Sequence, residues 1–336
     1  MIWASCRETI QFGSQYANCN APGLRLTSRP RGARRGPSRT SLRDVLALWL
    51  DIVDSVRQRL SALIRAFIRC YDQLPHMLTI RAEQLNEFRA HAQLKFERTL
   101  ANHARQFASK HTEVLGEDGT LTVVRLAILR GAKYGFSGQG PLQLFLDLMF
   151  LLGSEFDTDL QYPWAQEILG PNGPGGEMDK ADRLHAASIR YLDAVAGPAN
   201  EYAIAALNAL RNLDPDFIRQ PDSDFHSNAI PVMRQLYPQK AAYLGVEILQ
   251  AVVGRTMKEC KKRSVQTIPS LWVLLFLNYS LGHAITRDPL YPWVSKALED
   301  TRTANPEARV QQLANKARIY LERASDYLGG DKRVQV

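Results

Sequence analysis

The chain contains one motif twice, as Gly153-Ser154-Glu155-Phe156-Asp157-Thr158-Asp159-Leu160-Gln161-Tyr162-Pro163-Trp164 and as Gly282-His283-Ala284-Ile285-Thr286-Arg287-Asp288-Pro289-Leu290-Tyr291-Pro292-Trp293. The second copy begins 129 residues after the first, and both keep a glycine, an aspartate and Tyr-Pro-Trp at the same places. Each copy follows an apolar run, Leu142–Leu152 or Leu271–Leu281. Runs of this length favour buried helices. The motif therefore predicts two related helical units.

The match continues outside the motif at the same offset. Identical residues pair as Arg105-Gln106 with Arg234-Gln235, Leu115-Gly116 with Leu244-Gly245, and Val123-Val124 with Val252-Val253. Each unit is expected to run helix, turn at Leu-Gly, helix, break, apolar helix, glycine, loop and short helix. No alternating strand pattern occurs, so we predict an all-α fold of two tandem homologous units in one helical domain.

The expected boundaries follow from this pattern. The first unit spans 77–169, with helices at about 81–110 and 121–132, and the second spans 232–298. Residues 170–231 form a linker with helices at about 180–195 and 201–213 and a loop over 215–231. An amphipathic C-terminal helix covers 306–328. Before the units, 41–72 have helical apolar spacing, which predicts an amphipathic helix that docks on this chain, on a partner or on a membrane surface.

Residues 1–40 are rich in Gly, Pro, Ser and Arg, a composition typical of disorder. They are expected to be a disordered basic tail or a segment upstream of a true start at Met77. A basic arm for an anionic surface and an organellar transit peptide are the other interpretations.

The charge of the chain is concentrated at its beginning. Residues 1–43 hold eight arginines and one acid, so they carry +7 of the net charge of +8. The remaining body is nearly neutral and gives no support for binding a nucleic-acid backbone. The four cysteines are scattered and no apolar run is long enough to span a bilayer. A bacterial-type cytoplasmic protein without an integral membrane segment is expected.

The motif itself has a structural interpretation. Asp288 is expected to cap a turn with Pro289 at the first helical position, and Asp159 to cap the same turn in the first copy. Pro163 and Pro292 would then start short helices anchored by Trp164 and Trp293. In an alternative interpretation Tyr162 and Tyr291 stay partly exposed as contacts for a partner. The candidate structural or interaction residues are Gly153, Asp157, Asp159, Tyr162, Pro163, Trp164, Gly282, Asp288, Tyr291, Pro292 and Trp293.

Some chemistry remains possible at this motif. Glu155, Asp157 and Asp159 form an acidic cluster that could bind a divalent cation, although the second copy has Ala284 and Thr286 at the first two places. His283 could pair with Asp288 as acid and base, but a histidine beside a helix C-terminus is the simpler interpretation. The chain has no P-loop, dinucleotide-binding glycines, H-E-x-x-H or G-x-S-x-G. We therefore expect no enzyme, no cofactor and no metal.

A family resemblance begins at Met77. The residues that carry it are Met77-Leu78-Thr79-Ile80-Arg81-Ala82-Glu83-Gln84, Ala132-Lys133-Tyr134-Gly135-Phe136, Phe145-Leu146-Asp147-Leu148-Met149-Phe150, Gly153, Phe156-Asp157-Thr158-Asp159 and Pro163-Trp164. Over 77–169 the chain resembles a family of mostly uncharacterised bacterial proteins encoded beside type VI secretion spike and effector genes. The second unit looks like a degenerate copy. The resemblance implies an accessory protein and carries over no catalytic residues.

Four functions remain open at this point. The leading one is a non-enzymatic protein-binding factor, an adaptor or chaperone for a type VI secretion effector or spike component. The second is an immunity protein that neutralises a cognate toxin. The third is a metal-dependent enzyme using Asp157 and Asp159, and the fourth is a nucleic-acid or membrane binder acting through residues 1–70. The expected partner is another protein.

Overall fold

The structure, a computed structural model, describes residues 81–171, 173, 175–212, 224–265 and 267–330. The expectations for 1–40 and 41–72 lie outside these residues. Of the described chain, residues 93–330 belong to one compact unit and residues 81–92 to another. The helix that begins at Ala82 starts in the smaller unit, and the other described helices lie within residues 93–330.

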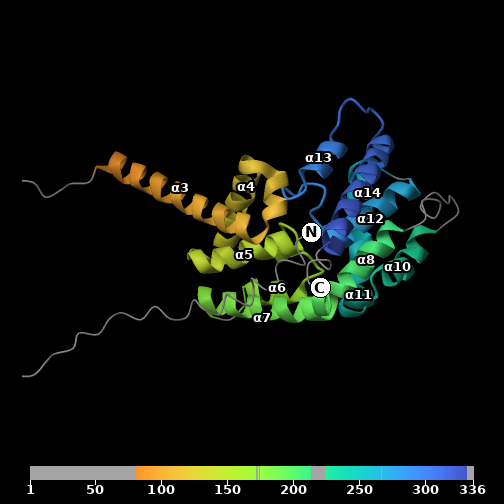
Figure 1. The fold of residues 1–336 in the computed structure, drawn as a ribbon, viewed down its shortest axis with the longest axis horizontal. Coiled ribbons are helices and arrows are strands. Elements are labelled where there is room, and N and C mark those ends of the chain that lie inside the picture. The colour runs from red at the N-terminus through yellow and green to blue at the C-terminus, as the bar shows by residue number, and fades with distance from the viewer. Residues whose placement is uncertain (1–80, 172, 174, 213–223, 266, 331–336) are drawn as a thin grey trace, which may run out of the picture. The chain divides into compact units, whose positions relative to one another are not determined.

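The described residues form helices and no strands, which confirms the all-α prediction (Figure 1). The α-helices are α3 (Ala82–Phe107), α4 (Ser109–Ala132), α5 (Gln139–Leu152), α6 (Pro163–Leu169), α7 (Glu177–Val195), α8 (Glu201–Arg211), α10 (Phe225–Leu236), α11 (Pro238–Lys262), α12 (Ile268–Leu281), α13 (Pro292–Leu298) and α14 (Pro306–Gly330). Two 3₁₀ turns, η2 (Phe156–Thr158) and η3 (Pro198–Asn200), lie between them. No helix within the described ranges has the length and apolar content needed to cross a bilayer.

The helices of the two motif regions begin and end at equivalent residues. Both bounds of α5 and α12 differ by 129, and so do both bounds of α6 and α13. The long helices α4 and α11 each contain one non-helical residue, Gly116 or Gly245, with φ angles of 71° and 74°. The expected turn at Leu-Gly is therefore present in both.

The packing partners of these helices correspond as well. In the first half α4 packs on α5, and α7 packs on both α5 and α6. In the second half α11 packs on α12, and α14 packs on both α12 and α13. Helices α7 and α14 thus hold the same place in the two halves, whereas the sequence assigned them to a linker and to a C-terminal extension.

One hydrophobic core joins the two halves. It contains Leu100, Phe145 and Tyr162 from the first half together with Leu274 and Leu313 from the second, and all five are buried. A separate cluster around Trp272 belongs to α10, α11 and α12. Burial on this scale is the main stabilising term of a fold, at about 25 cal/mol per Å² of apolar surface.

Two predicted element boundaries were wrong. The loop expected over 215–231 is helical from Phe225, where the Asp224 side chain caps α10 by accepting from the N–H of His226 at 3.1 Å. Burial of Phe225 and Ala229 in the second cluster stabilises this turn despite the proline at 231. The first helix ends at Phe107 rather than Lys110, because Ala108 has non-helical angles (φ −128°, ψ 52°) before α4 begins.

Candidate functional site

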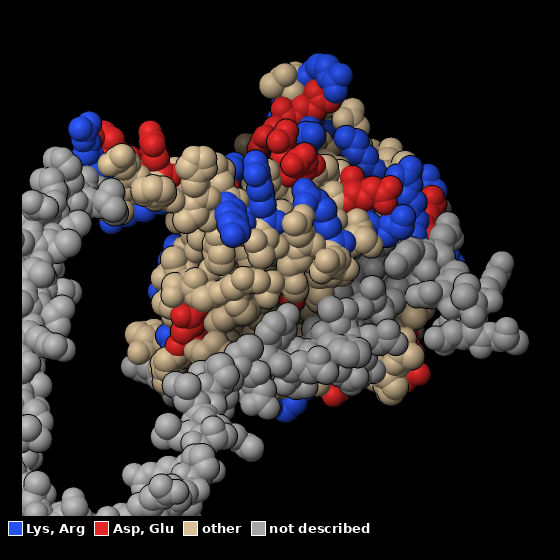
Figure 2. All heavy atoms as spheres, turned by 60° about the vertical axis from the view of Figure 1, so that its left-hand side comes forward, with Lys and Arg blue, Asp and Glu red and all other residues tan. Residues whose placement is uncertain are grey.

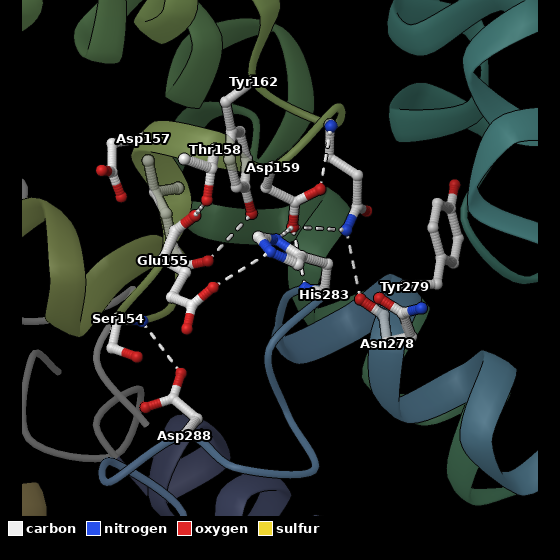
Figure 3. Close-up of polar contacts among 12 residues, drawn as sticks. Ser154, Glu155, Asp157, Thr158, Asp159, Tyr162, Asn278, Tyr279, His283 and Asp288 are labelled. Atoms are coloured by element: carbon white, nitrogen blue, oxygen red, sulfur yellow. Dashed lines mark hydrogen bonds and ion pairs between the residues drawn. The ribbon is translucent and has the colours of Figure 1, made fainter. Parts of the chain in front are cut away.

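The two copies of the motif lie against each other. The motif loops, residues 153–162 and 282–291, follow the C-termini of α5 and α12. In the first loop the backbone N–H of Ser154 donates to Oδ2 of Asp288, at 2.9 Å. In the second the backbone N–H of His283 donates to Oδ2 of Asp159, at 2.8 Å (Figure 3). Each loop therefore supplies the aspartate that satisfies the first N–H after the other loop's glycine.

Each of these aspartates also shapes its own loop. Oδ1 of Asp159 accepts from the N–H of Gln161 at 3.0 Å, and Oδ1 of Asp288 accepts from the N–H of Leu290 at 2.9 Å. The carbonyl oxygens of the two aspartates accept from the N–H groups of Tyr162 and Tyr291, both at 3.0 Å. Such side-chain-to-backbone bonds close a tight turn. Asp288 therefore caps a turn, and the expectation that Pro289 starts a helix was wrong; α13 starts at Pro292.

The glycines permit the close approach of the loops. Gly153 and Gly282 have φ angles of 102° and 103° with ψ angles of 152° and 157°, a region that side chains rarely adopt. A methyl group on Gly153 would lie 2.8 Å from the carbonyl oxygen of Leu281. On Gly282 it would lie 3.0 Å from the carbonyl oxygen of Leu152. Both positions require glycine for the same two reasons.

Tyr162 and Tyr291 are buried, with 2% and 5% of their surfaces exposed. The interpretation that they are partly exposed contacts was therefore wrong. The hydroxyl of Tyr162 donates to the carbonyl oxygen of Leu152 at 3.2 Å. Trp164 is buried beside Tyr162, and Trp293 is half-buried and stacks on Tyr320 of α14. Pro163 and Pro292 are the first residues of α6 and α13, as expected.

Two acids of the first loop, Glu155 and Asp159, contact His283 of the second loop, whereas Asp157 lies apart from it (Figure 3). Asp157 is buried and accepts from Nη2 of Arg130 at 2.6 Å and from the hydroxyl of Tyr134 at 2.7 Å. Glu155 accepts two bonds from the guanidinium of Arg287 in the second loop, at 3.1 and 2.7 Å. Asp159 binds backbone N–H groups. Within the described ranges no group of three or more His, Cys, Asp or Glu side chains is placed to hold a metal ion.

The second half uses other residues at the places of Arg130 and Asp157. Glu259 of α11 stands where α4 has Arg130, and Thr286 stands where the first loop has Asp157. The hydroxyl of Thr286 donates to Oε1 of Glu259 at 3.0 Å. Arg263, at the place of Tyr134, donates to the same oxygen at 2.7 Å. The contact between the long helix and the loop is thus present in both halves with different polar groups.

His283 contacts the acids of the opposite loop and not Asp288. Its Nδ1 lies 3.3 Å from Oδ2 of Asp159 and its Nε2 lies 3.3 Å from Oε2 of Glu155. Burial lowers the pKa of His283, but the interactions with Asp159 and then Glu155 outweigh burial, so this pKa lies above its usual value. An acid–base pair of His283 with Asp288 is not what the structure shows.

The two equivalent aspartates differ in acidity because of this histidine. For Asp159 burial raises the pKa, yet the interactions with His283 and with backbone N–H groups bring the pKa below its usual value. For Asp288, which has Ser154 at the equivalent place, burial dominates and the pKa is raised. The pKa of Glu155 falls to about 2, chiefly through its bond to His283 and despite burial.

The residues that sequence reasoning missed are the partners of these acids. Arg130 and Glu259 lie on the long helices, 27 residues before Asp157 and Thr286, and Tyr134 and Arg263 lie just after the ends of these helices. The offset of 129 was the signal available, since it pairs Arg130 with Glu259 and Asp157 with Thr286. In this arrangement the buried charges and backbone N–H groups of the two motif loops are paired with other groups of the protein. Such pairing is what a structural contact between the two loops requires.

No family model, curated protein or solved structure matches this chain.

Proposed function

We propose that this protein is a non-enzymatic, protein-binding accessory factor that acts as an adaptor or chaperone for a type VI secretion effector or spike component. The aspartates of the motif support a non-enzymatic role, because Asp157, Asp159 and Asp288 are buried and each is bound by groups of the protein itself. The resemblance over 77–169 supports the link to secretion. We also infer that the two halves arose by internal duplication, which the matched helix bounds and loop angles support.

The observation that carries the binding proposal is a groove between α4, α13 and α14. Its volume is about 270 Å³. Aromatic and aliphatic side chains form its floor and cations stand around it, and we call this surface the basic groove. The residues that line it are Lys110, His111, Val114, Leu290, Tyr291, Trp293, Lys316, Ile319, Tyr320 and Arg323.

The basic groove has the features of a surface that binds another protein. Val114 and Ile319 are 72% and 44% exposed, which is unfavourable for aliphatic side chains in water. Lys316 and Arg323 supply positive charge, Lys110 adds a cation that also pairs with Glu113 at 3.1 Å, and no described residue that lines the groove is acidic. Trp293 and Tyr320 stack at the floor and offer the large rigid surfaces that dominate binding energy at interfaces.

The occupant that fits is an acidic amphipathic segment of the effector or spike protein. Its apolar side chains would cover Trp293 and Ile319, and its carboxylates would pair with the cations around them. Figure 2 shows one face of the molecule, on which lysines and arginines are interspersed with acids.

The test is affinity capture of the tagged full-length chain from its host, followed by mass spectrometry. We expect a secretion effector or spike component in the captured material. The triple variant Lys110→Glu, Lys316→Glu, Arg323→Glu should lose it. A matched control, Lys258→Glu, Lys261→Glu, Lys262→Glu, reverses three exposed cations of α11 and should retain it.

Two results would contradict this proposal. One is the absence of any secretion component from the wild-type capture, and the other is equal loss of the partner in both triple variants. Co-expression with the captured partner then separates the two accessory roles. A chaperone or adaptor raises the soluble yield of the effector, whereas an immunity protein restores the growth of cells that express a toxin.

A further inference from the structure

A second cavity, partly open to its surroundings, lies between α5, α7, α8, α10, α11, α12 and α14, with a volume of about 100 Å³. Since a water molecule takes about 30 Å³ of liquid, this is room for roughly three waters or one small organic molecule. Its lining is mostly apolar, with side chains such as Phe150, Leu207, Leu236, Phe276, Leu277 and Leu321. No described residue that lines this cavity is acidic.

Lys240 of α11 is part of the lining and is only 3% exposed. Its ammonium group donates one hydrogen bond, to the carbonyl oxygen of Tyr279 at 2.6 Å. The same nitrogen lies 4.9 Å from the centre of the Tyr279 ring and 6.0 Å from that of Tyr162. An ammonium has three N–H donors, so two remain that face aromatic rings instead of acceptors. Burying an ammonium with two N–H groups that have no acceptor costs free energy, unless a further acceptor binds them.

The equivalent position in the first half shows what a structural role requires. His111 takes the place of Lys240 there, and its Nε2 is 2.7 Å from the carbonyl oxygen of Leu290. His111 also packs between Phe150 and Tyr291, just as Lys240 lies between Tyr279 and Tyr162. One uncharged donor is therefore enough to bind the carbonyl oxygen at this position of the fold. Lys240 adds a charge and two further N–H donors, which meet aromatic rings and no second acceptor.

A second polar group in the same cavity is also incomplete. Tyr191 of α7 lines the cavity and is fully buried, and its hydroxyl interacts with that of Tyr162 but with no other acceptor of the described residues. The rings of Tyr191 and Tyr162 are 5.4 Å apart. Both incomplete groups thus lie around the Tyr162 ring. Burial raises the pKa of Tyr191 well above its usual value, so its hydroxyl stays a donor at neutral pH.

We propose that this cavity binds a small organic carboxylate, with its carboxylate on Lys240 and the Tyr191 hydroxyl and its short aliphatic part against the leucines and aromatic rings. Both unsatisfied groups are donors and one is charged, so the missing partner is an anionic acceptor. The apolar lining excludes a strongly hydrated inorganic anion, and the volume limits the aliphatic part to a few carbons. Burial lowers the pKa of Lys240 to about 8, against the attraction of Asp159, and a bound carboxylate would raise this pKa.

The probe is butyrate, with butyramide as the uncharged molecule of the same shape and sodium chloride to match ionic strength. Saturation-transfer NMR and the melting temperature of the full-length protein report binding. We expect a saturation signal for butyrate and a melting temperature that rises with its concentration, as for any ligand of the folded state. Butyramide should give neither effect.

Two variants connect the binding to this cavity. Lys240→Met keeps the apolar length without the charge and should weaken butyrate binding by about tenfold or more. Tyr191→Phe removes one hydroxyl and should weaken the binding roughly fivefold. Lys258→Met, which removes an exposed lysine of α11 outside both the cavity and the basic groove, is the matched control and should bind as the wild type does.

The proposal is wrong if butyrate and butyramide act alike, or if Lys240→Met binds butyrate as tightly as the wild type. It is also wrong if no saturation signal appears, which would mean that water alone occupies the cavity. Because Tyr191→Phe leaves the charge in place, it keeps the test decisive should Lys240→Met fail to fold.

Discussion

Asp159 accepts a hydrogen bond of 2.8 Å from the backbone N–H of His283, a residue of the opposite motif loop. The converse bond, from the N–H of Ser154 to Asp288, is 2.9 Å long. An aspartate that is repeated in the sequence thus acts on the other copy as well as on its own loop. This exchange explains why the aspartate, the glycine before it and the turn to Tyr-Pro-Trp recur together, while Glu155 and Asp157 do not.

Alanine at Gly153 or Gly282 is expected to lower the free energy of unfolding by about 2 to 4 kcal/mol. The reasons are a backbone conformation that costs on the order of 1 to 3 kcal/mol for other residues and a contact with a backbone oxygen. Urea denaturation measures the change. Gly254→Ala is the control, since Gly254 is inside α11 and a methyl group there meets nothing within 4 Å. It should stabilise the protein by about 0.5 to 1 kcal/mol.

Asp157→Ala is expected to cost about 3 to 5 kcal/mol, because it leaves the buried guanidinium of Arg130 without its main partner. The control is Glu113→Ala, which removes an exposed ion pair with Lys110 and should cost about 0 to 1 kcal/mol. If the two substitutions lowered the free energy of unfolding equally in denaturant titrations, the Arg130–Asp157 pair would not stabilise the contact between α4 and the first motif loop.

His283→Ser gives the second loop the residue that the first loop has at this place. We expect the pKa of Asp159 to rise above its usual value, as the pKa of Asp288 does beside Ser154. A carboxyl ¹³C NMR titration follows both aspartates. An Asp159 pKa that stays below its usual value in the variant would contradict the role given to the histidine.

The same substitution should change how stability depends on pH. Because the pKa of Asp159 is lowered in the folded state, its contribution is present above the ordinary value of about 3.9 and is lost as the pH falls through the lowered value. Because the pKa of His283 is raised, its contribution is present below about 6.5 and is lost as the pH rises through the raised value. In denaturation of His283→Ser across this range the loss of stability at high pH should disappear. Because the Asp159 pKa is then raised, stability on the acid side should fall as the pH rises above about 3.9, the reverse of the wild-type trend.

Binding at the basic groove should depend on salt. If Lys110, Lys316 and Arg323 pair with carboxylates of a partner, raising the salt from about 0.05 to 0.3 M weakens these exposed pairs, because the screening length shortens. Trp293→Ala should weaken the complex by about 2 kcal/mol or more with the salt dependence kept. Titration calorimetry with the captured partner measures both effects, and a salt-independent affinity would speak against the basic groove.

Much of the fold was predictable from the repeat. The spacing of the apolar runs and of Tyr-Pro-Trp located α5, α6, α12 and α13, because prolines and glycines mark helix ends through local chemistry. The start of α10 was missed because its first turn is stabilised by burial of Phe225 against Trp272, a contact between distant residues. The equivalent places of α7 and α14 were missed for a similar reason, since packing position leaves little trace in composition.

The contact between the two motif loops was only partly predictable from the sequence. That Asp159 and Asp288 cap their own turns follows from local sequence patterns, but their bonds to the opposite loops depend on how the two halves pack. Arg130 and Asp157 form a pair in the first half, and Glu259 and Thr286 form the equivalent pair in the second. This correspondence is visible only after the structure shows which residues are in contact. Burial of Tyr162 and Tyr291 likewise depends on helices α7 and α14, which lie outside the motif.

Hydrogen exchange at two backbone amides is the most direct test of the bonds that Asp159 and Asp288 accept from the opposite motif loops. The N–H groups of Ser154 and His283 should exchange only as slowly as global unfolding allows, since both are bound by buried carboxylates. In Asp288→Ala the Ser154 amide should lose more protection than the His283 amide, and in Asp159→Ala the reverse should hold. Fast exchange of both amides in the wild-type protein, or equal loss of protection in the two variants, would contradict the contact described between the two motif loops.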